Sequence, residues 1–177
     1  MFAEWHDFYL LVGSAAGALI GLLFVVVTLT TGANVERTTR GIALYMTPTV
    51  FHFAIVVVIS ALTMTPLLAI DTLGALLGAI ALAGLIYQAT KAHGIRTTGT
   101  SAHWTDFWFY GAAPVAWYLA LAIVAVEVWR GMPDAPYWLG ALAVALLILG
   151  IRNAWDLVSW MAPRVDEMKK PDAKIDV

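Results

Sequence analysis

The chain has 177 residues, of which 61% are hydrophobic and only 12% are charged, whereas soluble domains contain about 45–50% apolar and about 25% charged residues. This composition excludes an ordinary soluble domain, and a formal net charge of −2 gives no general reason to expect nucleic-acid binding. Because the chain contains no cysteine, disulfides and sulfur-based zinc sites are excluded as well.

Apolar runs long enough to cross about 30 Å of hydrocarbon as helices recur along the chain. The sequence predicts an all-α bundle of about five spans, forming a single transmembrane domain over 1–177. The first run lacks the basic flank of a cleavable signal peptide, so we expect it to stay in the mature protein. The turn from Pro66 to Asp71 is so short that the second and third spans are expected to form a tight hairpin. The predicted spans are 8–29, 42–65, 72–90, 107–129 and 137–161, with a charged tail at 162–177.

The basic residues predict the orientation of the bundle, because short cytoplasmic loops carry an excess of Lys and Arg. Nine of the ten lie at alternate ends of successive spans, and only Arg130 lies on the opposite side. The N-terminus is therefore predicted outside and the C-terminus in the cytoplasm. The outer side then carries an acidic rim, which either attracts small cations or simply reflects the absence of basic residues there. Its members are Glu4, Asp7, Asp71, Glu127 and Asp134.

Small residues mark the faces through which membrane helices approach closely. Gly13, Gly17 and Gly21 form a doubled GxxxG pattern in the first span, and Gly74 and Gly78 repeat it in the third. This pattern indicates helix association. Whether the partner helix belongs to the same chain or to another molecule stays open.

The second span carries a polar stripe, whose side chains project within roughly 80° of one another on a helical wheel. Polar groups within a span usually face a bundle interior or a cavity, so the stripe is compatible with a hydrated path. Hydrogen bonding to neighbouring helices or to the helix backbone is the alternative interpretation. The stripe consists of Tyr45, Thr49, His52, Ser60 and Thr63.

His52 is the central candidate, because an ionisable side chain within a span is a functional hypothesis by default. Its ordinary pKa near 6.5 would suit a pH-sensitive gate, whereas a neutral, hydrogen-bonded histidine is the structural alternative. Arg152 and Asp156 are spaced to pair on one face of the fifth span. At similar depth, Tyr110, Arg152, Asn153 and Asp156 are expected to form a polar network with His52.

Metal and catalytic sites have little support in the sequence. Glu4, His6 and Asp7 are weak candidates for a metal site at the outer surface, and His93, His103 and Asp106 are weaker ones on the other side. No nucleophile elbow, Walker loop, HExxH motif or dinucleotide-binding fingerprint is present, so no cofactor is expected and an enzyme is the least favoured class.

The stretch Trp5-His6-Asp7-Phe8, the glycines from Gly13 to Gly21 and the run from Leu22 to Val26 resemble a loose group of small uncharacterised bacterial inner-membrane proteins. The resemblance covers mainly the first span. It implies a multi-pass protein of the bacterial inner membrane.

Three functional hypotheses follow. The first is a homo-oligomeric ion channel or small transporter with a polar path along the second span. The second is a non-catalytic accessory or scaffolding subunit that binds another membrane protein through its glycines. The third is a cofactor-binding membrane enzyme or electron carrier. The expected partners are the lipid bilayer, further copies or another membrane protein and, for a channel, small cations.

Overall fold

The computed structural model describes residues 1–30, 47–98 and 112–168, and every regular element in these parts is helical. A short 3-10 helix, Ala3–Trp5, leads into α1, His6–Thr30. The remaining helices are α3, Thr47–Met64; α4, Ile70–Thr98; α6, Ala113–Trp129; and α7, Ala135–Met168. The predicted all-α fold class is thereby confirmed.

Three stretches of helix are long and apolar enough to cross a membrane: Ala3–Thr28, Ile70–Thr90 and Ala135–Asp156. They correspond to the first, third and fifth predicted spans. The described apolar parts of α3 and α6 are shorter, Thr49–Met64 and Ala113–Trp129. The predicted beginnings of these two spans, 42–46 and 107–111, lie outside the described residues. The number of five spans therefore stays a prediction.

Two helices continue beyond their predicted spans. α4 reaches Thr98 instead of residue 90, and α7 reaches Met168 instead of residue 161. The chain remains helical through Pro163, where it was predicted to leave the helix. A proline removes one backbone hydrogen bond and bends a helix without always ending it. Hydropathy therefore marks the apolar length of these helices and misses their polar extensions.

The turn between α6 and α7 is built around Gly131, whose φ of 69° lies in the left-handed region. The Gly131 N–H donates to the Val128 carbonyl at 2.9 Å, and the Met132 N–H donates to the Glu127 carbonyl at 3.0 Å. These two bonds form a Schellman motif, which satisfies carbonyls that the helix end would otherwise leave open. The chain reverses within a few residues and begins α7 at Ala135.

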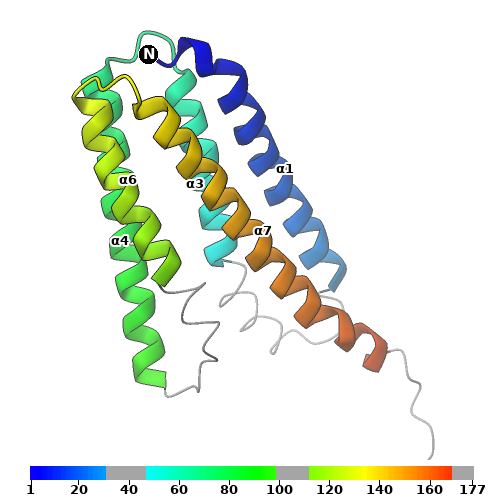
Figure 1. Ribbon diagram of the computed structural model, residues 1–177. Helices are drawn as coiled ribbons and strands as arrows, with labels where there is room; N and C mark the ends of the chain where they lie inside the picture. Colours follow the sequence, from blue (N-terminus) through cyan, green and yellow to red (C-terminus); the bar gives the residue numbers. More distant parts are fainter. Residues whose placement is uncertain (31–46, 99–111, 169–177) are drawn as a thin grey trace, which may run out of the picture.

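The helices form two closely packed pairs (Figure 1). The first pair is α1 with α3, and the second is α4 with α6. α3 and α4 make few contacts although they are consecutive, so the prediction of a tight hairpin is wrong. The short connection predicted from Pro66 is present, but it carries the chain from one pair to the other. A short connection keeps the joined ends of two helices close together. It does not determine which other helix each of them packs against along its length.

α7 joins the two pairs by packing against α1, α3 and α6. Tyr9 of α1 donates its hydroxyl to the Pro136 carbonyl at 2.9 Å, and Trp117 of α6 donates its Nε1–H to the Leu142 carbonyl at 2.7 Å. Each pair thus has a hydrogen bond to the backbone of α7. In Figure 1 the N-terminus lies at the same end of the bundle as the turns after α3 and α6.

Large apolar side chains also cover the outside of the bundle. Leu22, Leu82, Leu119, Ile123 and Ile148 are more than half exposed on four different helices. Such a surface is unfavourable in water and is suited to contact with lipid tails. Trp129, Tyr137 and Trp138 are exposed near the turn after α6, as expected for aromatic side chains at the depth of lipid headgroups.

Candidate functional site: buried polar groups between the helix pairs

The polar stripe of α3 faces the interior of the chain. Thr49, His52 and Ser60 are 0%, 1% and 2% exposed. Tyr45, the first residue of the predicted stripe, lies outside the described residues. Residues 52, 56 and 60 are separated by one helical turn each, so Val56 lies between His52 and Ser60 on the same face. Val56 is fully buried as well, and the buried face of α3 is therefore polar at both ends and apolar between them.

His52 lies next to Tyr118 of α6, with ring centroids 6.4 Å apart and ring planes inclined by 51°. The Tyr118 ring in turn lies so close to Gly84 of α4 that a Cβ at that position would overlap it. Gly84 therefore leaves the space that the Tyr118 ring occupies. His52 belongs to the first helix pair and Tyr118 to the second, so this contact lies at the boundary between the pairs.

Asn153 of α7 is fully buried near the same boundary. The nearby Gly150 packs on the ring of Phe53, the residue that follows His52. Three residues of α7 rise about 4.5 Å, so Asn153 lies within roughly one helical turn of the level of His52. All three structural units, the two pairs and α7, thus contribute a polar side chain to this level of the bundle.

These buried groups share an unusual property: their polar atoms have no hydrogen-bond partner among the described residues. This holds for both ring nitrogens of His52, the hydroxyls of Ser60 and Tyr118, and both amide atoms of Asn153. A buried polar atom without a partner costs about 1–3 kcal/mol of stability. Most native interiors contain only a few such groups, and each one calls for an explanation. His52, Tyr118 and Asn153 lie on three different helices at a similar level, whereas Ser60 lies two helical turns along α3 and packs against Gly13 of α1.

Arg152 and Asp156 form an ion pair on α7, with Nη1 and Oδ2 3.3 Å apart, as their spacing predicts. Their side chains are 35% and 41% exposed, so the pair lies at the rim of the interior and not in a fully buried network. Tyr110, the other predicted member of that network, lies outside the described residues. Among the described residues, the tyrosine ring beside His52 is that of Tyr118.

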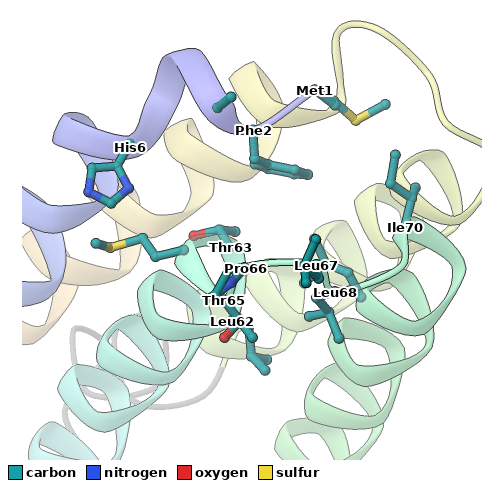
Figure 2. A pocket seen from close by; sticks show the side chains of 13 residues that line it. Met1, Phe2, His6, Leu62, Thr63, Thr65, Pro66, Leu67, Leu68 and Ile70 are labelled. Atoms are coloured by element: carbon teal, nitrogen blue, oxygen red, sulfur yellow. The ribbon is translucent and has the colours of Figure 1, made fainter.

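A cavity of about 530 Å³ opens at the N-terminal end of the bundle, between the start of the chain, the end of α3 and the start of α4 (Figure 2). Thr63, the last residue of the predicted stripe, and His6 line it. Its other walls are mainly apolar and include Phe2, Leu62 and Leu68. Ser60 lies three residues deeper on α3, and its backbone carbonyl accepts the Thr63 hydroxyl at 2.9 Å. The polar stripe of α3 thus reaches this cavity at the N-terminal end of the bundle.

The glycines of the predicted stripe of α1 have different surroundings in the structure. A Cβ at Gly13 would lie 2.7 Å from the Ser60 Cβ, so this glycine permits the close approach of α1 and α3. No described atom lies within 4 Å of a Cβ added at Gly17 or Gly21. Successive i+4 positions are displaced by about 40° around a helix, so the far end of the stripe turns outward. On α4, Gly74 packs against Trp129 of α6, whereas Gly78 is open.

The acidic rim residues all belong to the N-terminal segment, the α3–α4 turn region or the α6–α7 turn region, which share one end of the bundle. Among the described residues, no three His, Asp or Glu side chains gather closely enough to hold a metal ion. The weak candidates Glu4, His6 and Asp7 therefore form no such group among the described residues, where neighbouring residues on a helix point in different directions. His93, His103 and Asp106 lie outside the side chains that the structure describes.

Tyr118 was not recognised from the sequence, although the criterion that selected His52 applies to it. A hydroxyl in the middle of the apolar segment Ala113–Trp129 is a polar group within a span. Its helix carries no further polar stripe, however, and periodicity alone does not show which helix lies opposite. Only the pairing of α6 with α4 and its contact with α7 bring Tyr118 to His52.

The long apolar helices and the lipid-compatible surface define an integral membrane protein of the helical bundle class. Comparisons with protein-family models, with curated proteins and with solved structures find no match to this chain.

Proposed function

We propose that the chain is a small transporter or channel of the bacterial inner membrane, in which a solute passes between the two helix pairs of a single molecule. The observation that supports this proposal is the set of buried polar side chains His52, Tyr118 and Asn153, which lie at a similar level of the bundle and whose polar atoms have no hydrogen-bond partner among the described residues. Transport sites in membrane bundles commonly lie near the midplane, between units that move relative to one another. The arrangement of the helices is suited to such movement, since α3 and α4 make few contacts.

The burial of the α3 stripe favours a path within one molecule over a path along the axis of an oligomer. Side chains that line a shared axial pore would lie on the outer surface of each copy. Thr49, His52 and Ser60 are instead at most 2% exposed in the isolated chain. An oligomer is compatible with this proposal, but the polar path does not require one.

The energetic cost of the site supports a functional role. Each unpartnered group lowers the stability of the fold by about 1–3 kcal/mol, and apolar replacements of similar shape would remove that cost. Groups that destabilise a fold and gather at one place are typical of functional sites. A purely structural cluster would be expected to pair its members with one another.

The cavity near Thr63 supports one route into the interior. It places a space of about 530 Å³ within one helical turn of Ser60. From Ser60 to His52 the helix rises about 12 Å, and the intervening Val56 keeps this stretch closed and apolar. An apolar constriction between polar regions is a known form of gate in membrane pores. Opening this stretch would require α3 to move away from Gly13 of α1 at the Ser60 end and from Tyr118 of α6 at the His52 end.

The membrane orientation belongs to the same proposal. With the basic residues on the cytoplasmic side, the N-terminus and the cavity face the outside. The resemblance of the first span to bacterial inner-membrane proteins supports this location.

Reconstitution into liposomes tests the proposal. Purified protein is expected to increase the flux of small solutes, tested as a panel of cations, protons and neutral molecules, above that of protein-free vesicles. Tyr118→Phe keeps the buried ring and removes its unpartnered hydroxyl, so we expect it to reduce the flux. Tyr9→Phe is the matched control, because the Tyr9 hydroxyl bonds to the Pro136 carbonyl away from the site. Wild-type protein without measurable flux would contradict the proposal.

A second function has one specific observation in its favour. Gly17 and Gly21 of α1 have no described residue in front of them, and Ser14 and Ala18 on the same helix are exposed. Small residues on an outer face permit another transmembrane helix to pack closely. This would suit an accessory subunit or a homo-oligomer. Gly17→Leu and Gly21→Leu are then expected to reduce the mass of the complex measured by light scattering in mild detergent, and an unchanged mass would count against this function.

A further inference from the structure

We infer that the transported solute is a small uncharged molecule that both donates and accepts hydrogen bonds, of the chemical class of urea, and not an ion. This inference rests on the proposed transport function and names its substrate class. It departs from the expectation of cation transport, which was based on the acidic rim at the end of the bundle.

The first argument is the charge of the interior. The buried polar residues of the described chain are Thr49, His52, Ser60, Gln88 and Asn153, and none is an Asp, Glu, Lys or Arg. A cation that leaves water needs carboxylates or several converging oxygen atoms to replace its hydration shell. An anion needs Arg, Lys or a similar cationic group. Arg152 does bring a buried Nη1 to the edge of this interior, but that atom lies 3.3 Å from Asp156 Oδ2, so among the described residues no uncompensated charge of either sign is present there.

The second argument is the hydrogen-bonding character of the unpartnered atoms. A tyrosine or serine hydroxyl donates and accepts, an asparagine amide offers two donors and one acceptor oxygen, and a neutral imidazole offers one of each. Each of these side chains therefore offers both hydrogen-bond donors and hydrogen-bond acceptors. A monovalent cation would meet donors it cannot use, whereas a neutral amide or polyol can satisfy donors and acceptors together.

The charged side chains nearest to Asn153 in the sequence, Arg152 and Asp156, compensate each other. Arg152 precedes Asn153, but its guanidinium pairs with Asp156 on the same helix at 3.3 Å. The carboxylates of Glu4, Asp7, Asp71 and Asp134 are exposed at the other end of the bundle, beside the N-terminus and the short turns. They contribute no ligand to the level of His52.

Osmotic swelling of proteoliposomes tests this inference. The shrinkage and re-swelling of vesicles after mixing with urea is followed by stopped-flow light scattering, and K⁺ flux is measured on the same vesicles. We expect protein-dependent urea permeation with K⁺ flux at the level of protein-free vesicles. Asn153→Leu keeps a similar side-chain shape and removes the amide, so it should fold and should reduce urea permeation about tenfold, the factor that one hydrogen bond contributes.

The controls separate this inference from the proposed function. Tyr9→Phe should leave urea permeation unchanged, and a thermal melt should show Asn153→Leu to be at least as stable as the wild type. Protein-dependent K⁺ flux that falls in Asn153→Leu would overturn the uncharged substrate and keep the transport function. Urea permeation that is unaffected by both Asn153→Leu and Tyr118→Phe would also overturn the inference. Absence of all permeation would overturn both statements.

Discussion

The rings of His52 and Tyr118 lie beside each other with centroids 6.4 Å apart, one on α3 and the other on α6. This contact joins two helix pairs that otherwise meet mainly through α7. The imidazole nitrogens and the phenol hydroxyl have no hydrogen-bond partner among the described residues. The proposed function assigns the binding of the solute to this place, where the two helix pairs meet through polar groups.

Two buried tyrosines provide a matched test of this interpretation. Tyr9 and Tyr118 are both fully buried, but in the described parts of the chain only the Tyr9 hydroxyl has a partner, the Pro136 carbonyl at 2.9 Å. Tyr9→Phe should lower the free energy of unfolding by about 1 kcal/mol, because a satisfied bond is lost. Tyr118→Phe should leave it unchanged or raise it, because an unpartnered hydroxyl is removed. Thermal unfolding followed by circular dichroism in mild detergent compares them, and an equal loss in both variants would show that the Tyr118 hydroxyl is bonded.

Two glycines of α4 test the packing that holds Tyr118. A methyl group at Gly84 would overlap the Tyr118 ring, whereas Gly78 has nothing within 4 Å of an added Cβ. Gly84→Ala should destabilise the protein by about 1–3 kcal/mol through overpacking. Gly78→Ala should be neutral or slightly stabilising, since alanine favours the helix by up to about 1 kcal/mol. The same thermal measurement applies, and a tolerated Gly84→Ala would argue against the α4–α6 packing described above.

The pairing of α1 with α3 can be tested by cross-linking, because the natural chain contains no cysteine. A Cβ at Gly13 would lie 2.7 Å from the Ser60 Cβ, so a small shift brings a cysteine pair to the separation of about 3.5–4.5 Å that a disulfide requires. We expect Gly13→Cys with Ser60→Cys to form an intramolecular disulfide under mild oxidation in membranes. The control, Gly17→Cys with Ser60→Cys, should not do so, and the products are distinguished by mobility on non-reducing gels.

The orientation can be tested with single cysteines and a thiol reagent that does not cross membranes. Met132 is 49% exposed in the turn between α6 and α7, at the end of the bundle that holds the N-terminus. We expect Met132→Cys to be labelled from outside intact cells and Lys174→Cys only after the cells are broken. This follows from the nine basic residues on the predicted cytoplasmic side. Labelling of Lys174→Cys in intact cells would reverse the proposed orientation.

The positions of the helices could be predicted from the sequence because they depend on local properties. An apolar run in lipid must satisfy its own backbone hydrogen bonds, and a helix does so within one segment. The turn residues Pro66 and Gly131 act locally in the same way. The polar extensions of α4 and α7 were not predicted, because hydropathy locates apolar segments. It does not show whether the helix continues into the polar residues that follow.

The partners of the helices could not be predicted in this way. Gly13, Gly17 and Gly21 look equivalent in the sequence, yet among the described helices only Gly13 has a neighbour, Ser60 of α3, against it. Likewise, Tyr118 gains its importance from His52, a residue 66 positions earlier that lies next to it only in the folded bundle. Contacts between membrane helices depend on the shapes of two surfaces at once, and neither surface specifies its partner alone.

The sequence by itself thus determined the helical membrane class, the approximate helix positions and His52 as a polar residue within a span, because hydrophobicity and backbone hydrogen bonding act along the chain. The tertiary structure alone decided that α3 packs on α1 and not on α4, that its polar stripe is enclosed within one molecule, and that Tyr118 and Asn153 share the level of His52. The physical reason is that close packing and the burial of polar atoms are properties of several helices together.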